Sequence, residues 1–220
     1  PRNNFPLAAA AGYMFIAGGI GITPLLPMIT TVAASGAEWS LSYGGRHRAG
    51  MAFLDELAVH GPRVRPWPQD EHGLLDLDGP LATPRPGVLV YCCGPEPLLA
   101  AVEQRCATWP TGSLRVERFA AKPQQPVDPT TERDFDAVLA RSGRTICVRA
   151  GKSVLDALEA EGLAPRNSCR EGICGTCETG VLEGVPDHRD SLLSDDERAA
   201  NDTMMICVGR ALSDRLVLDL

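Results

Sequence analysis

Four cysteines in the C-terminal part of the chain have the type and spacing needed to hold a redox centre. Cys169, Cys174, Cys177 and Cys207 are separated by four, two and twenty-nine residues. Thiolates in a C-x4-C-x2-C arrangement with a distant fourth cysteine are the ligands of a [2Fe–2S] cluster. Such a cluster takes and gives single electrons, so the spacing predicts an electron-transfer site.

The residues between the first three cysteines suit this chemistry. Gly172 and Gly175 allow backbone conformations closed to other residues, so the loop can wrap closely and aim N–H groups at the cluster sulfurs. Structural zinc is an alternative. Zinc sites, however, usually combine two C-x2-C knuckles, or one knuckle with histidines, and this sequence has only a single C-x2-C knuckle. Disulfides suit a secreted chain, but no signal peptide is visible. A redox-active C-x-x-C would not explain Cys169 and Cys207.

Composition narrows the class of protein. The chain has 220 residues, is 44% hydrophobic and carries a net charge of −7, which argues against a nucleic-acid partner. No apolar run reaches the 18 residues of a membrane span, so no membrane partner is expected. Four further cysteines, at positions 92, 93, 106 and 147, favour a reducing cytoplasm. Residues 134–220 hold 10 basic and 16 acidic residues, so this acidic part could steer a basic partner or simply be solvated surface.

The chain is expected to form two domains. A proline-containing stretch with little apolar content, residues 120–133, predicts a linker between domains at 1–119 and 134–220. The first domain alternates expected strands (13–17, 39–43, 88–92 and 114–119) with helices (from Thr23, 51–59 and 96–106), which predicts a covered parallel sheet. The second has a hairpin at 135–149, later strands at 179–182, 204–208 and 215–220, and capping boxes at Ser153 and Ser194. This order predicts an α+β domain.

A glycine-rich turn follows the first expected strand. Gly18, Gly19 and Gly21 would let the backbone approach a phosphate, and the helix expected at Thr23 and Pro24 would attract its charge. Pro24 stands where the dinucleotide pattern has its third glycine, and no Walker lysine follows. The turn could instead serve only to pack helix on strand.

Two further turns follow expected strands. Cys93, Gly94 and Pro95 lie after the third strand, where ligands bind in open α/β sheets, although Cys93 could be a buried structural thiol. Arg46 and Arg48 follow the second strand, and their charges favour NADPH over NADH unless this is an ordinary exposed turn.

The two expected cofactors require a third. A nicotinamide delivers two electrons as hydride, whereas a [2Fe–2S] cluster accepts one at a time, so a flavin must stand between them. The chain shows no flavin site of its own. Because the sequence begins at Pro1 and not at Met, we expect an FMN domain upstream.

Over essentially its whole length the chain resembles the C-terminal two-thirds of a phthalate dioxygenase reductase-type protein, in which FMN, NAD and plant-type ferredoxin domains follow one another. The matching stretches are 18–24, 91–95, 117–119, the four cysteines, 187–190 and 216–220. The resemblance implies a ferredoxin-reductase-like α/β domain followed by a β-grasp ferredoxin domain.

The resemblance also implies residue roles. The pyrophosphate and nicotinamide side would be lined by Gly18, Gly19, Gly21, Ile22, Thr23 and Pro24. Arg46 and Arg48 would contact the adenosine end, and Cys93, Gly94 and Pro95 the nicotinamide ring. Phe119 would stack near the flavin, unless it packs in the core. Cys169, Cys174, Cys177 and Cys207 would ligate iron.

Members of this family serve separate Rieske-type oxygenases or form the reductase tail of haem-thiolate (cytochrome P450) fusions. The stretches 44–48 and 117–120 resemble the fused type more closely, so a haem-thiolate monooxygenase is the expected electron acceptor. A carrier module without nucleotide, a zinc-stapled binding protein and a dehydrogenase acting alone are the competing functions. Intact glycine turns argue against the first, and the last shows no substrate-pocket signature.

Overall fold

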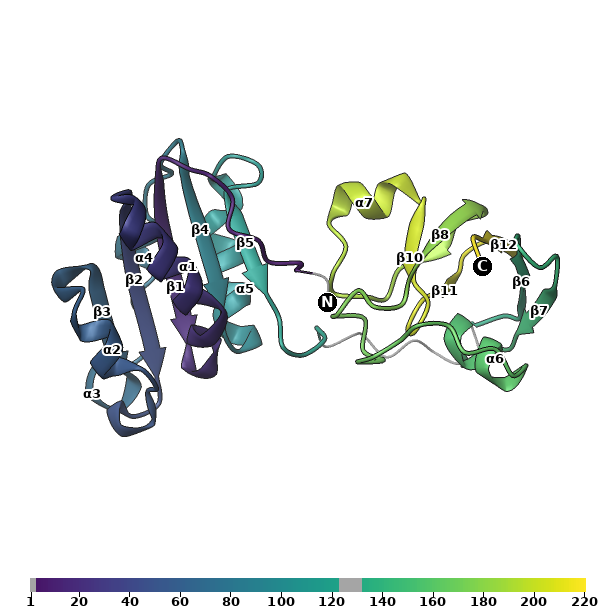
Figure 1. Ribbon diagram of the computed structural model, residues 1–220, viewed down its shortest axis with the longest axis horizontal. Helices are drawn as coiled ribbons and strands as arrows, with labels where there is room; N and C mark the ends of the chain where they lie inside the picture. The colour runs from purple at the N-terminus through teal and green to yellow at the C-terminus, as the bar shows by residue number, and fades with distance from the viewer. Residues whose placement is uncertain (1–2, 123–131) are drawn as a thin grey trace. The chain divides into compact units, whose positions relative to one another are not determined.

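The structure is a computed structural model that describes residues 3–122 and 132–220. It contains two compact units, Phe5–Phe119 and Ala120–Leu220, the latter grouped with the first residues of the chain. Each unit has its own sheet and hydrophobic core (Figure 1). Most of the expected linker, residues 123–131, lies outside the described residues.

The first unit is built on a five-stranded parallel sheet in the order β3-β2-β1-β4-β5. The strands are β1 (Gly12–Gly18), β2 (Glu38–Gly45), β3 (Val64–Pro68), β4 (Val88–Cys93) and β5 (Leu114–Glu117). The chain builds outward from β1 through β2 and β3, and then returns to the other side of β1 with β4. The strand order therefore reverses between β1 and β4, where an open α/β sheet binds its ligand.

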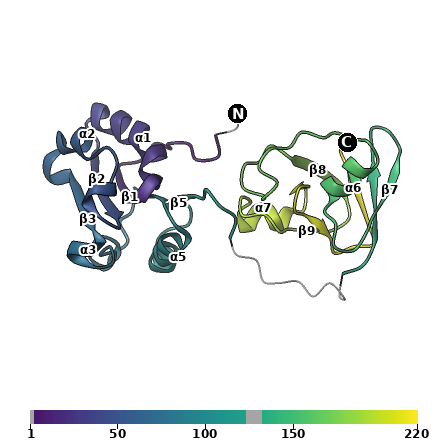
Figure 2. The ribbon, with the colours of Figure 1, turned by 90° about the horizontal axis from the view of Figure 1, so that it is seen from below.

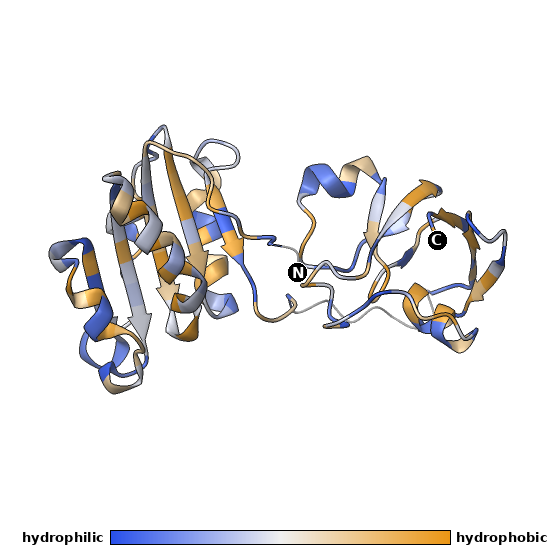
Figure 3. Ribbon diagram, viewed as in Figure 1, coloured by the Kyte–Doolittle hydropathy of each residue, from blue (hydrophilic) through white to orange (hydrophobic). Residues whose placement is uncertain are grey.

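Helices cover both faces of this sheet, so β1 is buried at every position (Figure 2). Alternate side chains of β1 point to opposite faces. Phe15 packs with α1 (Ile22–Ser35) and α2 (Leu54–Ala58), whereas Ile16 packs with α4 (Asp78–Leu81) and α5 (Glu96–Arg105). This two-sided burial explains the hydrophobic colour along most of β4 (Figure 3).

The second unit is an α+β domain with a mixed sheet in the order β10-β8-β12-β6-β7. Its strands are β6 (Phe135–Leu139), β7 (Thr145–Val148), β8 (Glu178–Glu183), β10 (Thr203–Met205) and β12 (Arg215–Leu218), with a small pair formed by β9 (Pro186–Asp187) and β11 (Arg210–Ala211). Helix α6 (Val154–Ala160) buries Leu155 and Leu158 in the core. Cys177 and Cys207 are buried in the same core, so the cysteine loop is built onto the domain interior.

Local signals in this domain are largely confirmed. Both capping boxes are present, with Ser153 at the start of α6 and Ser194 at the start of α7 (Asp195–Ala200). The strand expected at 204–208 ends at Met205, because the chain turns there to present Cys207.

Two helix predictions in the first unit are wrong. Helix α1 begins at Ile22 with Gly21 as its N-cap, so Thr23 is not the cap and Pro24 is not the first helical residue. The reason is a short 3-10 turn, Gly19–Gly21, that leads directly into the helix, while the Thr23 hydroxyl donates to the Ile20 carbonyl at 2.9 Å. The helix expected at 51–59 is only the short α2.

Candidate nucleotide site and iron–sulfur centre

The two glycine turns meet at the carboxyl ends of β1 and β4. A Cβ on Gly21 would lie 2.2 Å from the Cys93 carbonyl oxygen, and one on Gly94 would lie 3.0 Å from the Gly18 Cα. Backbone therefore packs directly on backbone, which only glycine permits. Gly19 differs, with a φ of 55° and nothing within 4 Å of a Cβ, so its turn faces open space. The glycines thus combine a packing role with an accessible turn before α1.

Cys93 is a buried, neutral thiol at this switch point. Burial, followed by the nearby Glu117 carboxylate, raises the pKa of Cys93 to about 12. The thiol therefore stays protonated at neutral pH and does not serve as a nucleophile. Its neighbour Cys92 points to the opposite face of the sheet, into the core against α5.

Glu117, at the end of β5, is a polar residue beside the switch point, and the sequence alone assigned it no role. It pairs in register with Cys93 on the adjacent strand, and burial raises the pKa of its carboxyl. Its buried Oε2 has no hydrogen-bond partner among the described residues. A buried polar atom without a protein partner is uncommon, so this oxygen remains available as a hydrogen-bond acceptor. The available signal was its place in the stretch 117–119 that resembles the family, at the end of the last expected strand of this domain.

The two residues after Glu117 differ in exposure: Arg118 is held in ion pairs, whereas Phe119 is exposed. Arg118 is 6% exposed and forms ion pairs with Glu96 and Glu103 of α5, at 3.0 and 2.7 Å, so it ties the end of β5 to that helix. Phe119 is 48% exposed, which excludes the core-packing alternative and leaves its ring free to stack on a planar ligand.

The basic turn after β2 is neutralised from a distant part of the chain. Helix α3 (Gln69–His72) lies against it, with the Asp70 amide donating to the Arg46 carbonyl at 3.2 Å. Arg48 forms a two-point ion pair with Glu71, and His47 lies 3.0 Å from Asp70. Among the described residues we find no carboxylate paired with the exposed Arg46, so Arg46 is the cation most available to a nucleotide.

The cysteine loop has the backbone that a cluster needs. Arg170, Gly172 and Gly175 have φ values of 60°, 70° and 71°, so the chain turns sharply between the cysteines. A Cβ on Gly172 would lie 2.8 Å from the Asp190 Cα, so close approach also requires glycine there. The strained Arg170 is held by two carboxylates of α6, those of Asp156 and Glu159, at 3.1 and 2.9 Å.

The four thiols fit a two-iron cluster. The thiols of Cys177 and Cys207 interact with each other, as do those of Cys169 and Cys174, giving two pairs. Within the described residues, no group of three or more His, Cys, Asp or Glu side chains is placed to hold a metal ion, so the cysteines meet only as these two pairs. A backbone hydrogen bond also reaches sulfur as expected, since the Glu171 amide donates to Cys169 Sγ at 3.4 Å.

Comparison with known proteins identifies the family. The model of the 2Fe-2S iron-sulfur cluster binding domain matches residues 138–212, which include all four cysteines. The whole chain is 50% identical to the phenoxybenzoate dioxygenase subunit beta of Ectopseudomonas oleovorans and covers 68% of it. The whole of this chain also matches the solved phthalate dioxygenase reductase, with 36% identity and a TM-score of 0.61. The match covers 69% of that protein. The chain belongs to the phthalate dioxygenase reductase family, which confirms the expected fold class and excludes the zinc alternative.

A second solved structure extends the comparison. An intact type IV self-sufficient cytochrome P450 monooxygenase matches all of this chain with 48% identity and a TM-score of 0.91. The chain spans only 29% of that protein's length. The chain is thus an oxidoreductase segment with a [2Fe–2S] domain. Among its described residues, no helix has the length and apolar character needed to cross a membrane.

Proposed function

We propose that this chain passes electrons from NADPH, through FMN held by an upstream domain, to its own [2Fe–2S] cluster and on to a haem-thiolate monooxygenase. One observation carries this proposal: the turns at Gly18 and Cys93 meet at the switch point of a nucleotide-binding sheet, in a chain that also carries a complete set of cluster cysteines. Both electron entry and electron exit are therefore provided.

Each group at the nucleotide site has a distinct task. The open turn at Gly19 and the fourteen-residue α1 receive the pyrophosphate, because N–H groups and the helix dipole favour an anion there. The buried, neutral Cys93 thiol lies beneath the nicotinamide side of the switch point and introduces no charge there. The unpartnered Glu117 oxygen accepts a hydrogen bond from the nicotinamide carboxamide, and the exposed Phe119 ring shields the flavin side from water.

The bound FMN supplies the change from a two-electron donor to a one-electron acceptor. The chain's own contribution on the exit side is the cysteine loop, whose thiolates hold iron while backbone N–H groups stabilise charge on sulfur. The eight cysteines, none of them in a disulfide within the described residues, support a cytoplasmic location.

The fused acceptor is favoured by the high similarity to the self-sufficient cytochrome P450 over the whole chain. A second candidate is a separate Rieske-type oxygenase. It is favoured by the 50% identity to a protein named as a dioxygenase subunit, of which this chain covers 68%.

Low-temperature electron paramagnetic resonance tests the route. The anaerobic chain, reduced with dithionite, should show the rhombic signal of a reduced [2Fe–2S] cluster. The same signal should appear with NADPH only when an FMN domain is supplied. A chain without iron would overturn the proposal. Mixing the reduced protein with a haem-thiolate domain or a Rieske oxygenase and following acceptor reduction distinguishes the two acceptors.

A further inference from the structure

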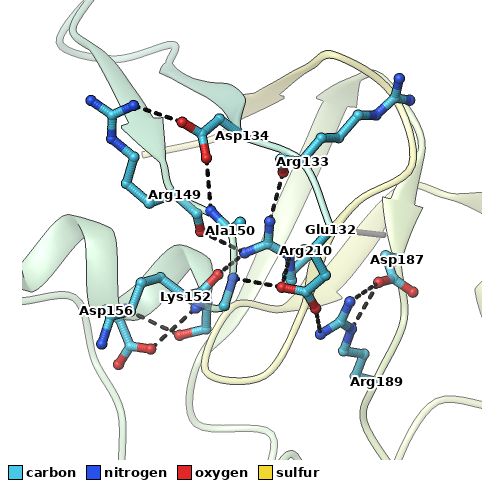
Figure 4. Close-up of polar contacts among 12 residues, drawn as sticks. Glu132, Arg133, Asp134, Arg149, Ala150, Lys152, Asp156, Asp187, Arg189 and Arg210 are labelled. Carbon is cyan, nitrogen blue, oxygen red and sulfur yellow. Dashed lines mark hydrogen bonds and ion pairs between the residues drawn. The ribbon is translucent and has the colours of Figure 1, made fainter. Parts of the chain in front are cut away.

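Glu132, the first residue described after 123–131, sits in a buried ion-pair network (Figure 4). Its side chain is 8% exposed. Its Oε1 accepts from Arg189 Nη1 at 2.7 Å, and its Oε2 accepts from the Gly151 amide at 2.6 Å and lies 3.5 Å from Arg210 Nε. Removing one partner of a buried pair leaves uncompensated charge, so losing the Glu132 carboxylate should be costly.

The two arginines join Glu132 to β9 and to the chain shortly after Cys207. Arg189 also binds Asp187 of β9 at 2.7 Å. Arg210 lies three residues after Cys207 and is 4% exposed. It donates to carbonyl groups at positions 133, 149 and 152 (Figure 4). Glu132 is therefore fixed to the ferredoxin domain before β6 begins.

The chain is also attached before residues 123–131. The Lys122 amide donates to Ser191 Oγ at 2.9 Å, and the Ser191 amide donates to the Gly172 carbonyl of the cysteine loop at 2.9 Å. The last residue described before 123–131 and the first described after it thus both bind the segment 187–191. The network of Lys122, Ser191, Glu132, Arg189 and Arg210 is called the linker anchor below.

We propose that the linker anchor fixes the chain to the ferredoxin domain from Lys122 onward, and that Ser191 and Glu132 are positioning residues for electron transfer. The span that tethers the two domains is then 119–122, not the whole of 120–133. Once a tether is long enough to span its sites, effective concentration falls with about the −3/2 power of its length, so lengthening it should slow delivery of electrons to the cluster. This inference rests on the proposed function.

Two insertions of the same twelve Gly/Ser residues test it, because both leave every anchor side chain in place. One follows Gln125, between the anchor points, and the other follows Ala120, outside them. They are compared in the protein that carries the FMN domain, by stopped-flow measurement of cluster reduction after mixing with NADPH. The insertion after Ala120 should slow reduction about tenfold, since the tether grows from about three to about fifteen residues. The insertion after Gln125 should change it less than twofold.

If the linker anchor is removed, the insertion after Gln125 (the inner insertion) should also slow cluster reduction. In a Glu132→Gln, Ser191→Ala background, the insertion after Gln125 should slow reduction as much as the outer one. Asp134→Asn is the matched control: Asp134 also binds an arginine and a backbone amide, at 2.6 and 2.8 Å, but directly before β6. Cluster absorbance confirms that each variant is folded and loaded.

A measurement that does not depend on electron transfer completes the test. Small-angle scattering of the 220-residue chain should show a larger radius of gyration after the outer insertion and no change after the inner one. Equal effects of the two insertions, or no effect of either, would overturn the inference. If dithionite but not NADPH reduces the cluster in the unmodified protein with its FMN domain, the proposed function fails, and the scattering comparison still decides the linker anchor.

Discussion

Arg48 and Glu71, twenty-three residues apart, form a two-point ion pair, with Nε to Oε1 at 3.1 Å and Nη2 to Oε2 at 3.2 Å. The carboxylate occupies the fork that a nucleotide 2′-phosphate would use. Under the proposed function, NADPH displaces Glu71 to bind Arg48, whereas NADH need not. We therefore predict that cofactor preference depends on an acidic residue as well as on the basic turn.

Glu71→Gln should raise the ratio of NADPH to NADH activity about threefold, because an exposed pair contributes little. Steady-state kcat/KM with both nucleotides measures this, together with binding of 2′,5′-ADP. Asp76→Asn is the control, since Asp76 pairs with Arg65 at 3.5 Å on the same unit. Arg48→Glu should shift the preference towards NADH, and an unchanged ratio in both variants would show that this turn does not select the cofactor.

Gly21→Ala should disrupt the meeting of the two turns. Its Cβ would lie 2.2 Å from the Cys93 carbonyl oxygen, and overpacking of this kind costs about 1–3 kcal/mol. We expect a lower melting temperature for the nucleotide domain and nicotinamide binding weakened more than tenfold. Gly50→Ala, at a position with nothing within 4 Å of a Cβ, should be neutral. Normal nucleotide binding by the Gly21 variant would contradict this account.

Cys174→Ser should separate the two halves of the route. Hydride transfer to a supplied flavin domain depends on the first unit and should be unchanged, while reduction of a one-electron acceptor should fall at least 100-fold as the cluster is lost. Cys147→Ser, which removes an exposed thiol of the same domain, should change neither rate. Full acceptor reduction by the Cys174 variant would place the cluster off the path.

Sequence reasoning succeeded where residue types at fixed spacings carry the signal. The four cysteines and the two capping boxes are patterns of this kind. It failed where partners come from afar, as with Glu71 opposite Arg48. The strand β3 was missed because Pro66 and Pro68 interrupt its pattern, and only its place at the sheet edge tolerates them.

The stability of the ferredoxin domain should depend on pH through Glu132. Burial opposes ionisation, but the hydrogen bond from Arg189 and the Gly151 amide lower the pKa of this carboxyl below its ordinary value of 4.5. The folded state therefore binds the proton more weakly than the unfolded state. Glu132 stabilises the fold fully above pH 4.5, and this contribution is lost as the pH falls through its lower folded pKa.

Glu132→Gln should cost roughly 3 kcal/mol at pH 7, because it leaves Arg189 and Arg210 without their shared carboxylate. The difference from the parent should shrink as the pH falls below 4.5. Urea unfolding of both proteins from pH 3 to pH 7 measures the two curves, and Asp134→Asn, which removes an exposed carboxylate, should give a smaller difference. A constant gap between Glu132→Gln and the parent across this range would show that the Glu132 charge does not hold the linker anchor.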